Sequence, residues 1–409
     1  MFHPAQLAPP RVRTNDERMS TRDCDGAGGA APSLGRRTFV GAGAGWVAGM
    51  AMVGVSGRSK SAGAKQPGVG QSAASVPKRP QPGAPREEDV KLPAGGNMPM
   101  RKLGRTGVNV SLLGLGGFHL GLPREEQTAR RIVRTAIDHG VTFMDNCWDY
   151  NDGKSEQWMG NALRDGYRQK VFLMTKIDGR TRASAAEQID QSLKRLATDV
   201  IDLVQIHEVI RMSDADRVFG PDGAIEALEA ARKAGKIRFI GFTGHKSPHI
   251  HLKMLTTAFA HKFRFDAVQM PLNVMDAHHD SFERLVLPVL IEHDIGVLGM
   301  KPLGSGLFLR SAAMRKKDGA VTPTDCLQYA MNLHTSVVIT GCDTPGILKQ
   351  GVNAAYRYQP YNQERLQRVL GATAPEAGGG TWEKYKTSDT FDGTAQHPWW
   401  LETASLQKP

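Results

Sequence analysis

The chain has 409 residues, of which 40% are hydrophobic and 23% charged, a balance that excludes a disordered or fibrous protein. Lys and Arg (52) outnumber Asp and Glu (41), but no block of five or six like charges occurs, so we expect no nucleic-acid partner. The 4 cysteines show no CxxC spacing, which excludes a zinc ribbon, and no apolar run reaches the roughly 18 residues of a membrane span.

The first 64 residues have the pattern of an export signal. Arg36-Arg37 precedes a mildly apolar stretch at 39–55, and Ala62-Gly63-Ala64 is a candidate cleavage site. This pattern resembles a twin-arginine (Tat) signal. It would engage the Tat export machinery and place the protein in the periplasm or elsewhere outside the cytoplasm, with the signal cleaved or kept as an anchor. The alternative is a leader with a chance pair of arginines, and Met19 is an alternative start.

Four parts follow from the changes in composition along the chain. Residues 65–98 are rich in Pro, Gly and Ser and cannot bury a core, so they are interpreted as a linker. We therefore predict a signal region at 1–64, the linker at 65–98, a folded domain at 99–365 and a C-terminal tail at 366–409.

The folded domain alternates short apolar runs with amphipathic stretches. Eight runs have the length and continuous apolarity of parallel strands covered on both faces. They are Val110–Leu115, Val141–Asn146, Val171–Lys176, Ile201–His207, Ile237–Thr243, Ala267–Leu272, Gly296–Pro302 and Val337–Gly341. Their spacing of roughly 25–35 residues fits βα units, and eight such units close a barrel. The predicted fold class is α/β, a (β/α)8 TIM barrel.

An open, doubly wound sheet is the competing architecture. It requires a Gly-x-Gly-x-x-Gly turn after the first strand, and residues 113–118 misplace the third Gly. Helix signals also separate the runs. Ser184 and Glu187 predict a capping box that opens a helix at 184–197, and the apolar face at 224–234 ends before Gly235.

Polar side chains end three consecutive predicted strands. Asp145, Lys176 and His207 lie at these ends, and Tyr150 follows Asp145 in the next loop. The carboxyl ends of barrel strands carry the active site, where buried polar groups must pair or meet a ligand. Asp145 and Lys176 can neutralise each other. An ammonium beside the Tyr150 hydroxyl is expected to lower the pKa of the phenol and make it a better proton donor.

Six stretches resemble the aldo-keto reductase family, in consistent order over about residues 99–355. They are the hairpin at 101–107, the Asp-x4-Tyr segment at 143–150, the Gly-x-Ser-Glu turn at 153–156, the lysine and histidine strands at 173–176 and 202–207, and the segment entering strand five at 234–241. The resemblance implies that the hairpin plugs the barrel floor. It also implies an enzyme that interconverts aldehydes or ketones and alcohols.

The resemblance assigns a role to each polar strand-end residue. Tyr150 is implied to be the general acid/base, and His207 to orient the substrate carbonyl. Lys176 would tune the pKa of Tyr150, and Asp145 would hold Lys176.

The same resemblance implies a nicotinamide dinucleotide as cofactor. The implied cofactor residues are Thr243, Gln269, Met300, Lys301, Pro302, Leu303, Ser305, Gly341, Asp343 and Gln350. Thr243 and Gln269 would bind the nicotinamide amide, and Met300 stands where the family usually has an aromatic that stacks on the ring. The family favours NADP, whereas Asp343, in place of a basic residue that pairs with the ribose 2′-phosphate, argues for NAD. Both cofactors are kept.

Three further features lie outside the predicted catalytic and cofactor residues. Cys147 shows no His partner in the sequence and is taken as a small buried residue. His249-x-His251 and His278-His279 lack a matched third ligand, so no metal site is predicted. The aromatic tail from Gly371 either covers the barrel mouth as a substrate wall, packs outside or stays loose.

Two other functions are left open. Gly244 and Met300 depart from the family pattern, which suits a nucleotide-binding regulatory or redox-sensing barrel without turnover. A Schiff-base aldolase using Lys176 or Lys301 is the other, although Asp145 would keep Lys176 protonated. The substrate is expected to be a small carbonyl compound or alcohol, and the sequence gives no closer identity.

Overall fold

The structure, a computed structural model, describes residues 96–315 and 321–408. The predicted signal region at 1–64 and all but the end of the linker at 65–98 lie outside the described residues. In the described part of the chain, no helix is both long and apolar enough to cross a membrane.

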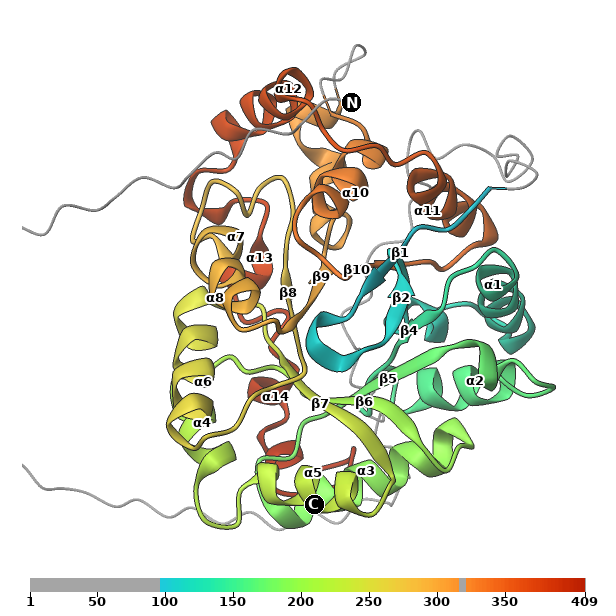
Figure 1. Ribbon diagram of the computed structural model, residues 1–409, viewed down its shortest axis with the longest axis vertical. Coiled ribbons are helices and arrows are strands. Elements are labelled where there is room, and N and C mark those ends of the chain that lie inside the picture. Colours follow the sequence, from blue (N-terminus) through green and yellow to red (C-terminus); the bar gives the residue numbers. More distant parts are fainter. Residues whose placement is uncertain (1–95, 316–320, 409) are drawn as a thin grey trace, which may run out of the picture. The chain divides into compact units, whose positions relative to one another are not determined.

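Eight parallel strands close into a barrel in the order β10-β3-β4-β5-β6-β7-β8-β9, which confirms the predicted fold class (Figure 1). The strands are β3 (Leu113–Gly116), β4 (Phe143–Asp145), β5 (Phe172–Ile177), β6 (Ile201–Ile206), β7 (Ile237–Thr243), β8 (Ala267–Pro271), β9 (Gly296–Met300) and β10 (Val337–Gly341). Seven of the predicted runs match a barrel strand to within about two residues at each end.

The first predicted strand, Val110–Leu115, is wrong because the structure divides this run between two strands. Val110 and Ser111 belong to a hairpin strand, and the barrel strand β3 begins at Leu113. The Ser111 hydroxyl donates to the Leu113 carbonyl at 2.6 Å and holds a bend between the two segments. The run is continuously apolar because Val110 packs inside the barrel and Leu113 packs under the helices, so hydrophobicity alone does not show the break.

The hairpin consists of β1 (Met100–Lys102) and β2 (Asn109–Ser111), and it plugs the amino end of the barrel as predicted (Figure 1). Leu103 and Val110 join the cluster of side chains inside the barrel. The Arg105 backbone N–H donates to the Asp294 carbonyl at 2.9 Å, just before β9 begins. The amino end is thus filled, which leaves the carboxyl end of the strands for a site.

Alternation along the strands decides which side chains point into the barrel. Phe143, Met174 and Leu203 belong to the interior cluster, whereas their chain neighbours pack under the helices. Successive residues of a strand point to opposite faces. Asp145 and Lys176, each two residues beyond an interior side chain, therefore point inward at the carboxyl end.

Helices surround the barrel and cover the outward strand faces. They are α1 (Glu126–Asp138), α2 (Lys154–Ala162), α3 (Arg182–Leu196), α4 (Ser213–Phe219), α5 (Ala224–Lys233), α6 (Pro248–Ala260), α7 (Phe282–Leu285), α8 (Leu287–Glu292), α9 (Ala312–Arg315), α10 (Pro323–Asn332), α11 (Pro345–Tyr356), α12 (Gln363–Thr373), α13 (Lys384–Thr387) and α14 (Gly393–Gln396). The predicted capping box at Ser184 is wrong: the N-cap of α3 is Thr181, and Ser184 is its reciprocal partner inside the first turn.

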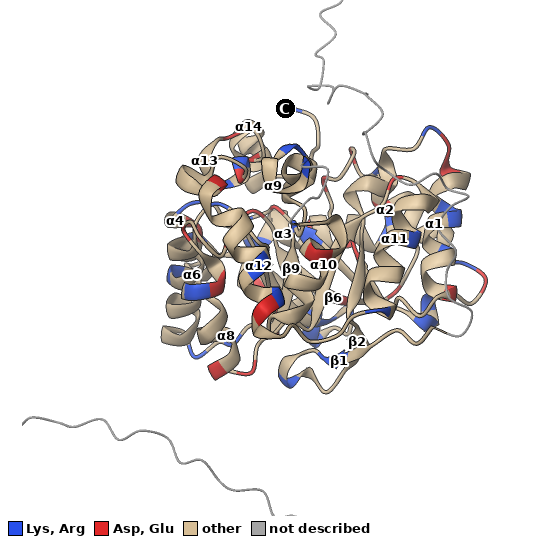
Figure 2. Cartoon of the chain, turned by 90° about the horizontal axis from the view of Figure 1, so that it is seen from above, with Lys and Arg blue, Asp and Glu red and all other residues tan. Residues whose placement is uncertain are grey.

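The tail returns across the carboxyl end of the barrel. Figure 2 places α13 and α14 at the end of the molecule opposite the β1–β2 hairpin. Gly393 and Thr394 donate backbone N–H groups to the Glu208 carboxylate at 2.9 and 2.6 Å. The Trp400 ring meets the Trp148 ring edge-on at 6.0 Å between centroids. Of the three arrangements considered from the sequence, the tail adopts the one that covers the mouth.

Candidate active site

The ammonium of Lys176 connects the strand ends. Its Nζ donates to the Asp145 carboxylate, to the Asn146 carbonyl oxygen at 2.7 Å and to the Tyr150 hydroxyl oxygen at 3.2 Å. Lys176 and Asp145 are both buried, with 1% and 4% of their surface exposed. An ammonium has three N–H donors, and each has an acceptor here. The side chain is therefore fixed, with the Tyr150 hydroxyl as its outermost contact.

The environment of Tyr150 acts on its pKa in the opposite direction to the one predicted. Burial, with the negative charge of Asp145 next, raises the pKa of the Tyr150 phenol well above its usual value of 10. The expectation of a lowered pKa is wrong because burial disfavours the phenolate, and the charge of Asp145, which pairs with the same ammonium, adds to this effect. At neutral pH the phenol therefore keeps its proton and is uncharged. It can act as a proton donor but not as a phenolate base.

The imidazole of His207 lies beside this phenol. Its ring meets that of Tyr150 edge-on at 5.8 Å between centroids, and Phe118 meets the other side of Tyr150 at 5.4 Å. Burial lowers the pKa of His207, so the ring is neutral at neutral pH. Its Nδ1 lies 2.9 Å from Oδ1 of Asp178, which fixes the orientation of the ring. The structure thus brings together all four residues of the predicted catalytic set.

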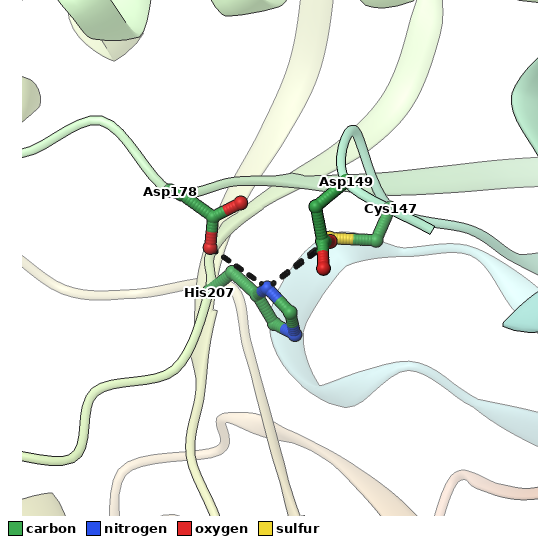
Figure 3. A group of neighbouring side chains, drawn as sticks. All are labelled: Cys147, Asp149, Asp178 and His207. Atoms are coloured by element: carbon green, nitrogen blue, oxygen red, sulfur yellow. Dashed lines mark hydrogen bonds and ion pairs between the residues drawn. The ribbon is translucent and has the colours of Figure 1, made fainter. Parts of the chain in front are cut away.

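Three residues around Nδ1 of His207 were missed or misread from the sequence. Cys147 does have a His partner: its Sγ lies 3.2 Å from Nδ1 of His207, so its interpretation as a purely packing residue is wrong (Figure 3). Asp149 and Asp178 complete the group. Their places, next to Tyr150 and two residues after Lys176, mark them as strand-end loop residues. The loop conformation that turns them toward His207 has no signal in the sequence.

The predicted nicotinamide-binding residues Thr243, Gln269 and Met300 also come together. The Met300 sulfur lies 3.5 Å from Nε2 of Gln269 and 4.0 Å from Oγ1 of Thr243. Oε1 of Gln269 is buried without a hydrogen-bond partner, and so are both amide atoms of Gln205. Gln205 points into the barrel from β6 and was missed from the sequence. Buried amide atoms without partners indicate a polar ligand at this end of the barrel.

The loop after β9 carries Lys301, Pro302, Leu303 and Ser305. Lys301 and Ser305 both have a positive φ, 56° and 57°. The Lys301 ammonium lies 5.3 Å from the ring centroids of Tyr385 and of Phe391 in the tail. Burial lowers the pKa of Lys301 from 10.5 to about 8. The loop therefore turns the Lys301 ammonium toward the mouth, under the tail, where it loses its proton at a lower pH than a lysine in water.

The remaining predicted cofactor residues follow β10. Gly341 ends the strand, and a Cβ there would come within 2.0 Å of Nδ1 of His119, so a larger residue would displace the His119 ring. Asp343 is half-buried, and its Oδ1 has no hydrogen-bond partner. Gln350 lies on α11, half-buried. Gly341 is paired with Gly116 of β3, whose other neighbour is Asp145 of β4, so the end of β10 lies two strands from Asp145.

Comparison with known proteins places the chain in a family. The model of the aldo/keto reductase family matches residues 112–363, more than half of the chain. The chain therefore belongs to the aldo/keto reductase family, and it is an oxidoreductase. The matched region includes the whole barrel except the hairpin, and it ends before the tail.

Individual relatives agree with this assignment. The uncharacterized oxidoreductase YrpG of Bacillus subtilis (strain 168) is 31% identical over 240 residues, 54% of this chain and 71% of the relative. L-galactose dehydrogenase of Arabidopsis thaliana is 28% identical over 313 residues, 68% of this chain and 94% of the relative. Among solved structures, the holo form of aldo-keto reductase AKR11C1 from Bacillus halodurans has a TM-score of 0.57 at 25% identity and covers 70% of this chain and 100% of that one.

Proposed function

We propose that the protein is an NADPH- or NADH-dependent reductase of aldehydes or ketones that also runs in reverse as an alcohol dehydrogenase. One observation carries the proposal: the Lys176 ammonium, held by Asp145, lies 3.2 Å from the Tyr150 hydroxyl oxygen at the carboxyl end of the barrel. A phenol fixed in this way can donate a proton to a carbonyl oxygen that enters the mouth.

Each residue of the set contributes a separate step. Tyr150 would break its O–H bond and pass the proton to the carbonyl oxygen. A nicotinamide dinucleotide, when bound, would supply the hydride for the carbonyl carbon. Lys176 donates a hydrogen bond to the phenol oxygen and stabilises the charge that it acquires. His207, held neutral by burial, orients the carbonyl oxygen toward the phenol. The products are the alcohol and the oxidised dinucleotide.

The residues around the mouth fit a nicotinamide dinucleotide. The amide atoms of Gln269 and Gln205 that have no partner match the hydrogen-bonding groups of a carboxamide. Lys301 would add a positive charge for an anionic ligand. Asp343 argues against a 2′-phosphate and for a 2′-hydroxyl, whereas the family habit favours NADP. We therefore propose NADP as the first candidate for the cofactor and NAD as the second, and titration with both nucleotides distinguishes them.

The first experiment is a titration of the purified protein with NADPH and with NADH, followed by nicotinamide fluorescence. We expect quenching by one or both nucleotides, and nucleotide oxidation with at least one member of a broad panel of aldehydes and ketones. Binding without any turnover would favour the alternative, a regulatory or redox-sensing protein. That alternative is motivated by Met300, which replaces the aromatic residue usual in the family and whose sulfur contacts Thr243 and Gln269. If the protein shows neither nucleotide binding nor turnover, both the proposed function and this alternative are refuted.

We further propose that residues 1–64 direct Tat export, because Arg36-Arg37 precedes an apolar stretch rich in small residues. Folding before export allows the enzyme to carry its nucleotide across the membrane. Fractionation of a host that expresses the full chain should place it outside the cytoplasm with nucleotide bound. The Arg36→Lys, Arg37→Lys double variant should stay in the cytoplasm, and equal export of both forms would refute this proposal.

A further inference from the structure

Four side chains with metal-binding atoms converge beside the proposed catalytic set. Cys147 and Asp149 come from the loop after β4, Asp178 from the loop after β5, and His207 from the end of β6 (Figure 3). One ligand atom of each lies within 4.8 Å of every other. We call this group the Cys147 cluster. Cys147 and Asp178 are fully buried and His207 is 8% exposed, so the cluster is enclosed by protein.

The spacing of the ligand atoms suits a tetrahedral cation. Nδ1 of His207 lies 2.9 Å from Oδ1 of Asp178, 3.2 Å from Sγ of Cys147 and 3.5 Å from Oδ1 of Asp149. Bonds of about 2.0–2.3 Å to a tetrahedral zinc ion place its ligand atoms roughly 3.3–3.8 Å apart. The three distances from Nδ1 of His207 fall within about 0.4 Å of this range, and all ligand atoms lie within 4.8 Å of one another, so small side-chain movements would open the cluster around an ion. Asp149, with 15% of its side chain exposed, is the most exposed of the four side chains.

The cluster lacks positive charge of its own. Oδ2 of Asp178 and Oδ1 of Asp149 are buried without a hydrogen-bond donor. Two carboxyl groups and a thiol in one enclosed space repel one another once ionised, and buried charges require a partner. A cation bonded to one oxygen of each carboxylate and to the sulfur would supply that partner.

The neighbouring cations are already engaged. Lys176 donates to Asp145, Asn146 and Tyr150. Arg180 is paired with Asp214, and its other donors go to main-chain carbonyl oxygens. Neither side chain hydrogen-bonds to an Asp149 or Asp178 carboxylate oxygen.

We propose that Cys147, Asp149, Asp178 and His207 bind a divalent transition-metal ion, with zinc(II) as the best match. A thiolate and an imidazole exclude magnesium and calcium, which take oxygen ligands, and the mixed S, N, O set with tetrahedral spacing is typical of zinc. The three anionic ligands and the ion sum to one negative charge, next to the Lys176 ammonium. The sequence predicted no metal site, because the histidine pairs at 249–251 and 278–279 lack a third ligand, whereas this cluster joins residues from three separate strand ends.

The ion would also set the proton position on His207, a consequence that rests on the proposed function. Nε2 of His207 points away from the thiol and the carboxylates (Figure 3). With Nδ1 bonded to the ion, the neutral ring carries its proton on Nε2 and donates to a carbonyl oxygen. With Nδ1–H donating to Asp178 instead, Nε2 can only accept. Metal binding itself is independent of this step and of turnover.

The test uses the untagged full-length protein, stripped with a chelator and titrated with zinc(II) and with cobalt(II). We expect about one equivalent bound per chain, and a thiolate-to-cobalt charge-transfer band that reports the Cys147 sulfur. Cys147→Ser should abolish the band, and Asp178→Asn should weaken zinc affinity about 100-fold or more. Cys326→Ser, which alters another buried thiol, is the matched control and should bind like the unaltered protein.

Several outcomes would overturn the proposal. They are no bound equivalent at micromolar free zinc, a charge-transfer band that survives Cys147→Ser, or a loss of binding in Cys326→Ser equal to that in Cys147→Ser. Circular dichroism of each variant separates a lost ligand from a lost fold, and Asp149→Asn provides a second ligand variant if Cys147→Ser does not fold. A protein that binds zinc but turns over no carbonyl would keep the metal site and refute only the proposed function. A protein that turns over a carbonyl compound but binds no zinc would keep the proposed function and refute the metal site.

Discussion

The Lys176 ammonium lies 3.2 Å from the Tyr150 hydroxyl oxygen, yet the pKa of that phenol is raised. Burial disfavours the phenolate, and the negative charge of Asp145, which accepts from the same ammonium, disfavours it further. The contact therefore positions the phenol and does not ionise it in advance. Proton donation to a substrate, followed by rapid stabilisation of the phenolate by Lys176, is the chemistry that this arrangement allows.

Replacing Tyr150 with Phe should lower kcat for carbonyl reduction by about 10²- to 10⁴-fold, the usual contribution of a general acid. The Kd of the nucleotide should stay the same because the ring is kept. Steady-state kinetics and fluorescence titration measure the two quantities. Tyr167→Phe is the control, since its hydroxyl makes only an exposed contact with Asp138. Retention of the rate within about 10-fold in Tyr150→Phe would rule out this general acid.

Nucleotide affinity should fall as the pH passes 8. Burial lowers the pKa of Lys301 from 10.5 to about 8, so its ammonium is present below pH 8 and lost above it. An anionic nucleotide binds the protonated form better, so its Kd should rise with pH. Lys301→Met should weaken binding about 10-fold at pH 7 and remove the step at pH 8, as expected for one charge-assisted hydrogen bond. Lys236→Met, which removes a surface ion pair with Asp190, should change neither the Kd at pH 7 nor its pH dependence. A Kd with the same pH profile in Lys301→Met would contradict the assignment.

The Glu208 carboxylate should keep the tail closed. It accepts the backbone N–H groups of Gly393 and Thr394, and Glu208→Gln replaces one acceptor oxygen with an amide donor that opposes them. We expect the amide hydrogens of 393–404 to exchange about 5- to 150-fold faster, which corresponds to a loss of roughly 1–3 kcal/mol of local stability. Hydrogen exchange measured by mass spectrometry reads this directly. Glu402→Gln, which breaks an exposed pair with Arg217, serves as the control, and equal exchange in both variants would contradict the prediction.

His251 should make the fold sensitive to acid. Burial lowers the pKa of His251 from 6.5 to about 3, so the folded protein keeps the ring neutral while the unfolded chain takes up a proton below pH 6.5. Below pH 6.5 the unfolded state therefore binds more protons than the folded state, and the free energy of unfolding falls as the pH falls toward 3. Between pH 6.5 and 5 this single group should cost about 2 kcal/mol.

Denaturant unfolding at several pH values tests the role of His251. Its ring packs against Phe242 and Phe282, so His251→Phe keeps the aromatic contacts and removes the titration. The variant should lose about 2 kcal/mol less than the unaltered protein between pH 6.5 and 5. An unchanged pH dependence would show that another group controls acid stability.

The barrel could be predicted because its strands are read from a short-range pattern. Each continuously apolar run must be covered on both faces, so its length and spacing are set locally. Because the carboxyl ends of barrel strands meet at one end of the barrel, the sequence also predicts that Asp145 and Lys176 lie close together. The pattern failed at Ser111, where one apolar run serves two strands, and at Thr181, whose capping role depends on a bond to Ser184 rather than Glu187.

The features missed from the sequence depend on contacts between distant segments. Asp178 reaches His207 only because two loops fold toward each other, and Asp392 of the tail lies 3.0 Å from Nε2 of His245, 147 residues away. The pKa of Tyr150 was predicted in the wrong direction because the degree of burial is a property of the assembled mouth. The residue identities suggested the chemistry, but the environment of each group required the structure.

The most direct test of the account is the transfer of deuterium from a nicotinamide nucleotide labelled at its hydride-donating carbon. With an accepted aldehyde or ketone, the unaltered enzyme should place the deuterium on the carbinol carbon of the product, as seen by mass spectrometry. Tyr150→Phe should bind the same nucleotide and form almost no labelled alcohol. Labelled alcohol formed equally well by both proteins, or none formed by either despite tight nucleotide binding, would contradict the account.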